Sequence, residues 1–130
     1  MTAVRVRNYH LDGYGHVNHA RYLEFLEEAR WAFFEQHGLL PLPDGLQLVV
    51  ARLDIRYRRA ATEGAVLHFA AEIKELTARH LVLRQRIILS ESGKSAAEAD
   101  VTLMPVDGGS GRGIRFPEPV SAFLQSLITP

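Results

Sequence analysis

The stretch that decides the fold is DGYGHVNHARYLEFLEEARW, Asp12 to Trp31. It opens with a single acid in a glycine-containing loop, and after Asn18 the apolar residues recur at helical spacing. Asn18 is a residue type that often caps the first turn of a helix. The first backbone N–H groups of a helix have no partner inside it, and the helix dipole is positive there. The stretch therefore predicts a carboxylate close to unpaired backbone donors.

The helix is predicted to run from about Asn18 to the residues before Gly38, since Pro41 and Pro43 keep it from resuming. Its apolar face is expected to pack on a core and consists of Tyr22, Phe25, Leu26, Ala29 and Phe33. The opposite, polar face is expected to carry Glu24, Glu27, Glu28 and Arg30.

Alternation of apolar and polar residues predicts a first strand at Val4–Tyr9 and four long strands after the helix, within 49–59, 67–74, 80–90 and 95–106. A hairpin turn is predicted at 91–94 and a short last helix at Val120–Ile128. The order predicts an α+β domain, an antiparallel meander wrapped around one long central helix. Arginines are expected on the outer or edge face of that sheet, and dimerisation would cover its edge: Arg52, Arg56, Arg84 and Arg86.

The composition narrows the range of partners. The chain has 130 residues, which fits one domain, and its 15 Lys and Arg balance its 15 Asp and Glu. This balance gives no electrostatic reason to expect nucleic acid or a membrane as a partner. The absence of cysteine excludes disulfides and thiol nucleophiles. With no apolar leader and no run of about 20 apolar residues, we expect a cytoplasmic protein.

Asp12 is the leading candidate for chemistry. A carboxylate can attack a thioester carbonyl or activate water against it. Oriented N–H groups in the first helical turn can stabilise the oxyanion that forms. The alternative is that Asp12 only caps its turn, a common role of Asp in loops.

Other side chains around the loop suggest further chemistry. His10, His16 and His19 lack the spacing of a helical zinc motif, so no metal site is predicted. Asp12 with His16 permits a hydratase, in which the pair activates water across a double bond. The motifs of serine hydrolases, NTPases and zinc peptidases are absent.

Candidate binding residues are less specific. Arg58 and Arg59 follow each other at the end of a strand and could grip phosphates, although such a pair is more often a solvated edge. Tyr14, Tyr22 and Phe25 could line an acyl pocket, although aromatic residues at helical spacing are usually core.

Two segments carry a resemblance to a known family. VRNYHLDGYGHVNHARYLEFLEEARW (Val6–Trp31) and IRYRRAA (Ile55–Ala61) resemble hotdog-fold acyl-CoA thioesterases of the 4-hydroxybenzoyl-CoA thioesterase type. They are especially similar to long-chain acyl-CoA thioesterases of bacterial fatty-acid metabolism. The resemblance implies a single hotdog domain over residues 1–130 and a homodimer that joins two sheets, often paired into a homotetramer. Active sites would lie at the dimer interface.

The resemblance also implies an activity and residue roles. It implies hydrolysis of a fatty acyl-CoA to the free acid and CoA, without metal or organic cofactor. Asp12 would be base or nucleophile, and the backbone N–H of His19 would face the thioester oxygen. Asn18 would shape the helix start or position water, and Arg58 and Arg59 would lie near the CoA phosphates. An enoyl-thioester hydratase on the same fold and a non-catalytic acyl-CoA binding or sensing module remain alternatives.

Overall fold

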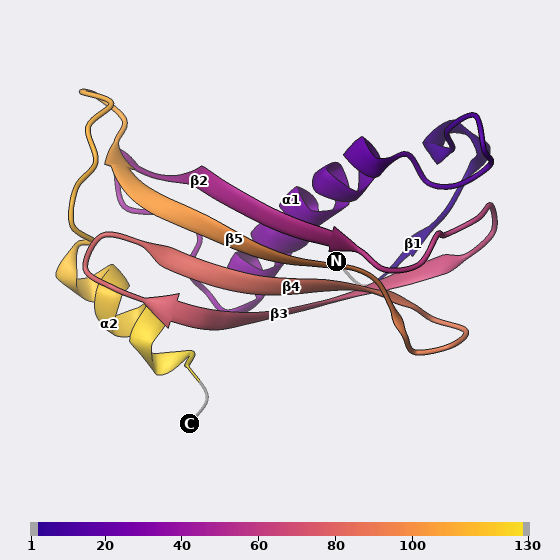
Figure 1. The fold of residues 1–130 in the computed structure, drawn as a ribbon. Coiled ribbons are helices and arrows are strands. Elements are labelled where there is room, and N and C mark those ends of the chain that lie inside the picture. The colour runs from indigo at the N-terminus through magenta and orange to yellow at the C-terminus, as the bar shows by residue number, and fades with distance from the viewer. Residues whose placement is uncertain (1–2, 129–130) are drawn as a thin grey trace.

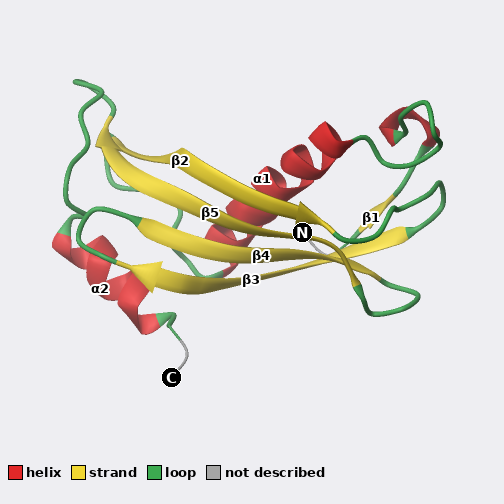
Figure 2. Ribbon diagram, in the orientation of Figure 1, coloured by secondary structure: helices red, strands yellow, loops and turns green. Residues whose placement is uncertain are grey.

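The computed structural model describes residues 3–128 and has the α+β architecture expected from the sequence (Figure 1). An antiparallel sheet curves around the long helix α1, and a short helix, α2, lies at the opposite end of the sheet from the 3₁₀ helix η1 (Figure 2). The elements in chain order are β1 (Val4–Arg5), η1 (Asn8–His10), α1 (His19–Gln36), β2 (Leu46–Tyr57), β3 (Val66–Leu76), β4 (Leu81–Leu89), β5 (Ser95–Asp107) and α2 (Glu118–Ser126).

The strand order in the sheet is β1-β3-β4-β5-β2, with every neighbouring pair antiparallel. β3, β4 and β5 form the expected meander. The expectation that β2 opens this meander is wrong, because α1 carries the chain across the sheet before β2 begins (Figure 1). β2 therefore pairs with β5 and forms one edge of the sheet, and β1 forms the other.

The first strand is shorter than its sequence pattern indicates. Only Val4–Arg5 pairs with β3, and the expected continuation to Tyr9 is wrong because the chain turns into η1. The ring of His10 causes this turn, since its Nδ1 accepts the backbone N–H of Arg7 at 2.9 Å. A side chain within the turn thus replaces the strand partner that the alternation suggested.

α1 begins and ends as predicted, with Asn18 as its N-cap and Gly38 just beyond its end. Its buried side chains face the sheet: Tyr22, Phe25, Leu26, Ala29, Arg30 and Phe34. The assignment of Arg30 to the polar face is wrong, since it is 8% exposed and its Nη1 donates to Oε1 of buried Gln85 at 3.2 Å. Gln85 in turn donates to the carbonyl of Leu26 at 3.0 Å. A polar partner on β4 therefore makes this buried cation tolerable.

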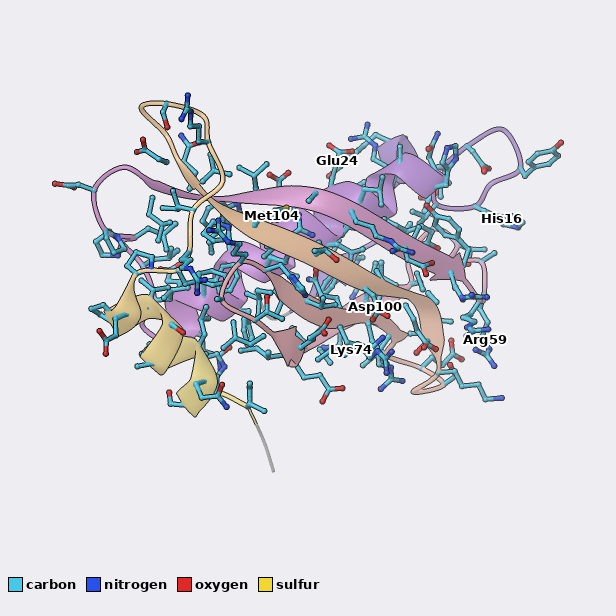
Figure 3. All side chains as sticks on the ribbon, turned by 60° about the vertical axis from the view of Figure 1, so that its left-hand side comes forward. His16, Glu24, Arg59, Lys74, Asp100 and Met104 are labelled. Atoms are coloured by element: carbon cyan, nitrogen blue, oxygen red, sulfur yellow. The ribbon has the colours of Figure 1, made fainter. Side chains whose placement is uncertain are left out.

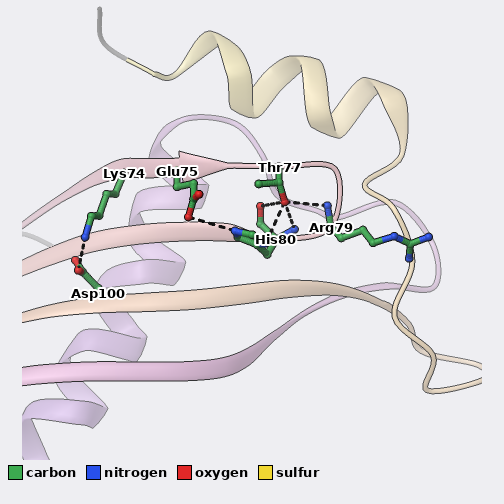
Figure 4. A network of polar contacts seen from close by, with 6 residues as sticks. All are labelled: Lys74, Glu75, Thr77, Arg79, His80 and Asp100. Atoms are coloured by element: carbon green, nitrogen blue, oxygen red, sulfur yellow. Dashed lines mark hydrogen bonds and ion pairs between the residues drawn. The ribbon is translucent and has the colours of Figure 1, made fainter.

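The outer face of the sheet is charged, as expected for its arginines. Arg84 and Lys74 both contact the carboxylate of Asp100, at 3.1 and 2.7 Å. The hydrogen bond from Arg84 holds the pKa of Asp100 below its usual value. Figure 4 shows Lys74 and Asp100 near a second pair, Glu75 and His80, whose atoms lie 3.3 Å apart.

α2 starts two residues earlier than predicted, because Pro119 in its first turn is compatible with a helix start. Within residues 3–128, the structure contains no helix with the length and apolarity needed to cross a membrane. The same residues form no cluster of three His, Asp or Glu side chains that could hold a metal ion.

The buried ring of His10 predicts a specific loss of stability in acid. Burial, aided by Arg21 and Arg7 and opposed by Glu24, lowers the pKa of His10 in the native state. The unfolded chain takes up this proton near pH 6.5, the usual value. Below about pH 6.5 the unfolded state then binds more protons, so stability falls as pH falls toward the native-state pKa of His10.

We expect the variant His10→Asn to show a smaller decrease in Tm between pH 7.5 and pH 5.0 than the wild type. The Asn amide oxygen can still accept the Arg7 N–H but does not titrate. Thermal unfolding followed by circular dichroism at the two pH values measures this. An equal decrease in both proteins would contradict the assignment.

Candidate active site

The Asp12 loop is a tight hairpin between Leu11 and Val17, which form an isolated antiparallel bridge. The N–H of Asp12 donates to the carbonyl of His16 at 2.7 Å, and the N–H of Gly15 donates to the carbonyl of Asp12 at 3.1 Å. Gly15 has φ of 79°, in the left-handed region that glycine adopts without a steric penalty. This arrangement matches hairpin loops in which a turn is followed by a left-handed residue.

The half-buried carboxylate of Asp12 uses only one of its oxygens to hold this loop. Oδ1 accepts the backbone N–H groups of Tyr14 at 2.8 Å and His16 at 3.2 Å. Among residues 3–128, no protein donor bonds to Oδ2. Asp12 therefore caps its turn and still has one oxygen available for chemistry.

The start of α1 supplies a free backbone donor. The side chain of Asn18 accepts the N–H of Ala20 at 2.9 Å, and its carbonyl accepts the N–H of Arg21 at 2.9 Å. The N–H of His19, which precedes these two donors in the chain, donates to no protein acceptor among the described residues. The Asn18 amide oxygen is thus used as a helix cap, and the His19 N–H is the first-turn donor left for a ligand.

Two tyrosines pack beside the first turn of α1. The hydroxyl of Tyr57, at the end of β2, donates to the carbonyl of His19 at 3.1 Å, and the two rings meet edge to face at 6.5 Å. The ring of Tyr22 lies 5.6 Å from that of Tyr57. Sequence analysis assigned no site role to Tyr57, and only its position beside the Arg58-Arg59 pair could have pointed to it.

His16 does not form the side-chain pair that hydratase chemistry needs. Its backbone, through both N–H and carbonyl, is bonded to Asp12, and it also forms a bridge with Thr62. Its side chain is exposed, and within residues 3–128 no hydrogen bond joins the imidazole to the Asp12 carboxylate.

Two of the three aromatic candidates for an acyl pocket, Tyr14 and Phe25, have opposite surroundings within one chain. Tyr14, at the tip of the loop, is 87% exposed. Phe25 is 8% exposed and belongs to the core, with its ring centred 5.1 Å from that of His10 and 6.5 Å from that of Phe69. A single chain therefore does not bring Tyr14 and Phe25 into one pocket.

The adjacent arginines differ in their surroundings. The backbone N–H groups of both Arg58 and Arg59 donate to the carbonyl of Ala96, which fixes the chain after β2. The side chain of Arg58 lies 3.6 Å from Glu98, whereas that of Arg59 donates to the carbonyl of Ser95 at 3.0 Å. Among the described residues Arg59 has no acidic partner. Figure 3 shows Arg59 at the same end of the molecule as His16.

Comparisons with known proteins identify the family to which the chain belongs. A family model described as the thioesterase-like superfamily matches residues 6–124. The long-chain acyl-CoA thioesterase FadM of Escherichia coli is 39% identical over 108 residues, which cover 82% of each chain. The acyl-CoA thioesterase YbgC of Haemophilus influenzae is 33% identical over 129 residues, covering 95% of this chain and 93% of the relative.

A solved structure extends the likeness to three dimensions. YbaW of Escherichia coli, described as a probable thioesterase, superimposes with a TM-score of 0.83 at 32% identity and covers 98% of both chains. The curved antiparallel sheet around α1 is the hotdog fold. A family model matches most of the chain, and two relatives above 30% identity cover 82% and 95% of it, so the chain belongs to the thioesterase-like superfamily.

Proposed function

We propose that this protein hydrolyses acyl-CoA thioesters to a free acid and CoA in the cytoplasm. The observation that carries the proposal is the carboxylate of Asp12, whose Oδ2 accepts no hydrogen bond from the described residues, in the loop that leads into α1, where the N–H of His19 is free. The two relatives named for acyl-CoA thioesterase activity support a CoA thioester as the substrate.

The geometry supports one division of labour. The thioester carbonyl would lie at the start of α1, where the N–H of His19 donates to the oxygen as negative charge develops. Asp12 Oδ2 would either take a proton from the attacking water or attack the carbonyl carbon itself. In the first case water adds to the carbonyl carbon, the C–S bond breaks, and the CoA thiolate leaves and takes up the proton. In the second case the C–S bond breaks as a mixed anhydride with Asp12 forms, and water then hydrolyses this anhydride, which releases the acid and restores the Asp12 carboxylate. Asn18 would act by capping the helix start.

We also propose that the active unit is a homodimer formed along β2. β2 is an edge strand, and edge strands readily pair with another chain. Its side chains Val49 and Val50 are each 43% exposed, and Trp31 on α1 is 44% exposed. A partner on this edge would bring its own residues to the neighbourhood of Tyr14, which within one chain has no pocket. The charged outer face is then available for pairing two dimers.

The alternatives fit the site less well. A hydratase needs an acid and an imidazole that act together, and the Asp12 carboxylate and His16 ring are joined only through backbone bonds. A binding or sensing module needs no reactive carboxylate. Release of free thiol, compared with loss of enoyl-CoA absorbance, separates these functions.

The Asp12→Asn variant separates the catalytic role of Asp12 from its structural role. Asn keeps an oxygen that accepts the N–H groups of Tyr14 and His16, but it loses the charge and the reactive oxygen. We expect Asp12→Asn to keep the wild-type Tm and lose at least about 100-fold in kcat/KM. Asp12→Ala should lower both Tm and kcat/KM, because the turn also loses its hydrogen-bond acceptor. Thiol release over a panel of acyl-CoA lengths measures activity.

Asp44, in an exposed loop, provides a matched control, and Asp44→Asn should leave activity unchanged. If Asp12→Asn retained near wild-type kcat/KM on the best substrate, Asp12 would be a turn residue only.

The two arginines should differ in their effect on CoA binding. Arg59 lacks an acidic partner, so its charge is available to a phosphate, whereas Arg58 is already paired with Glu98. We expect Arg59→Ala to raise KM for acyl-CoA about tenfold, the value of one charge-assisted hydrogen bond, and Arg58→Ala to raise it less. Neither should affect an acyl-N-acetylcysteamine thioester, which lacks the phosphates. Equal effects on both substrates would refute phosphate binding.

The β2 edge can be tested through the molecular mass in solution. We expect the wild type to elute at twice the chain mass or a multiple of it, and Val49→Lys to shift toward the monomer, because a lysine on an edge strand opposes pairing. Val49→Ile, which keeps the strand preference, is the control. Size-exclusion chromatography with light scattering measures the mass, and a dimer that persists in Val49→Lys would place the interface elsewhere.

A further inference from the structure

The hydroxyl of Tyr22 is a buried polar atom that the fold does not explain. Tyr22 is 4% exposed, and among the described residues its hydroxyl oxygen is the one buried side-chain polar atom without a hydrogen-bond partner. Leaving a buried hydroxyl unpaired costs stability. Phenylalanine would fill the same space without that cost, so stability gives no reason for a tyrosine here.

Tyr22 lies one helical turn after the start of α1. Tyr22 follows His19 by three residues, which places both on one helix face. Helical side chains lean toward the N-terminus and cover the preceding turn. The ring contact with Tyr57, whose own hydroxyl bonds to the His19 carbonyl, places the Tyr22 ring against that turn. The Tyr22 ring thus lies beside the helix turn that carries the free donor of the candidate site.

The electrostatic surroundings of the hydroxyl include the Asp12 carboxylate. Burial raises the pKa of Tyr22, the Tyr57 phenol and the Asp12 carboxylate add to the rise, and the Ala61 backbone opposes it without reaching hydrogen-bond geometry. Ala61 itself holds the loop, because its carbonyl accepts the N–H of Val17 at 2.9 Å. The phenol therefore stays protonated and is a permanent donor beneath the loop.

We propose that Tyr22 is a positioning residue for the reaction: in the substrate complex its hydroxyl donates to Oδ2 of Asp12 and fixes the angle of the reactive oxygen. This inference rests on the proposed function. Oδ1 is already held by two backbone N–H groups, so a donor on the other oxygen completes the control of the carboxylate plane. Hydrogen bonds of this kind are often long before substrate binds and tighten in the complex.

The variant Tyr22→Phe gives opposite signs for stability and activity. We expect Tm to stay equal or rise, because an unpaired hydroxyl leaves the core. We expect kcat to fall about tenfold with KM within about twofold, because a misplaced catalytic group affects the transition state more than binding. Tyr9→Phe is the matched control, since Tyr9 is 67% exposed and has no assigned role in the site. Unchanged kcat, or a lowered Tm, would show that the hydroxyl serves the fold alone.

An NMR measurement tests the contact without relying on activity. In protein carrying ¹³Cζ-labelled tyrosine, the Tyr22 resonance is assigned by its loss in Tyr22→Phe. We expect it to shift in Asp12→Asn, whereas the Tyr9 resonance stays in place. A Tyr22 resonance that does not move would overturn the inference. If wild type released no thiol, the proposed function would fail while this measurement would still decide the contact.

Discussion

The backbone hydrogen bond from the N–H of Val17 to the carbonyl of Ala61, 2.9 Å long, joins the Asp12 loop to the chain just after β2. Val17 directly precedes the N-cap of α1, and Ala61 follows the Arg58-Arg59 pair. This one bond therefore brings the acid and the free end of the helix, which belong to one stretch, together with the arginines, which lie about 40 residues later in the chain. The bond from the Asn18 N–H to the carbonyl of His10, at 2.9 Å, secures the same loop from its other side.

A second constraint sets the orientation of α1 on the sheet. Apolar packing alone would allow α1 to rotate or slide, because dispersion contacts have little direction. The two buried hydrogen bonds from Arg30 to Gln85 and from Gln85 to the Leu26 carbonyl are directional. A shift of α1 along β4 would leave a buried charge without its partner, which is costly. The polar core thereby supports the position of the helix start, where the chemistry is proposed.

The features that the sequence predicted are those that depend on local pattern. The residue type of Asn18 indicates where the helix starts. Alternation predicts β3, β4 and β5 as strands, and the short turns between them predict that they pair. The features it missed depend on distant partners. Arg30 was predicted to be exposed because its buried partner, Gln85, lies 55 residues away in the sequence. β2 was placed beside the wrong strand because alternation predicts a strand without predicting which strand pairs with it. The first strand ends early because the ring of His10 accepts the backbone N–H of Arg7, a contact that the alternation of apolar and polar residues does not predict.

The site shows the same limit at the scale of single atoms. The sequence predicted Asp12 as a candidate catalytic residue. It could not distinguish this role from capping the turn, since both roles use an aspartate at this position. The structure assigns the turn to Oδ1 and leaves Oδ2 unbonded by any donor of the described chain. Tyr22 shows the converse: helical spacing assigned its ring to the core, correctly, and gave no information about its hydroxyl. A core position filled by tyrosine with no partner for its oxygen is more costly than one filled by phenylalanine. Such a cost is expected where a fold gives up stability for function, and here it lies one helical turn from the free N–H of the proposed site.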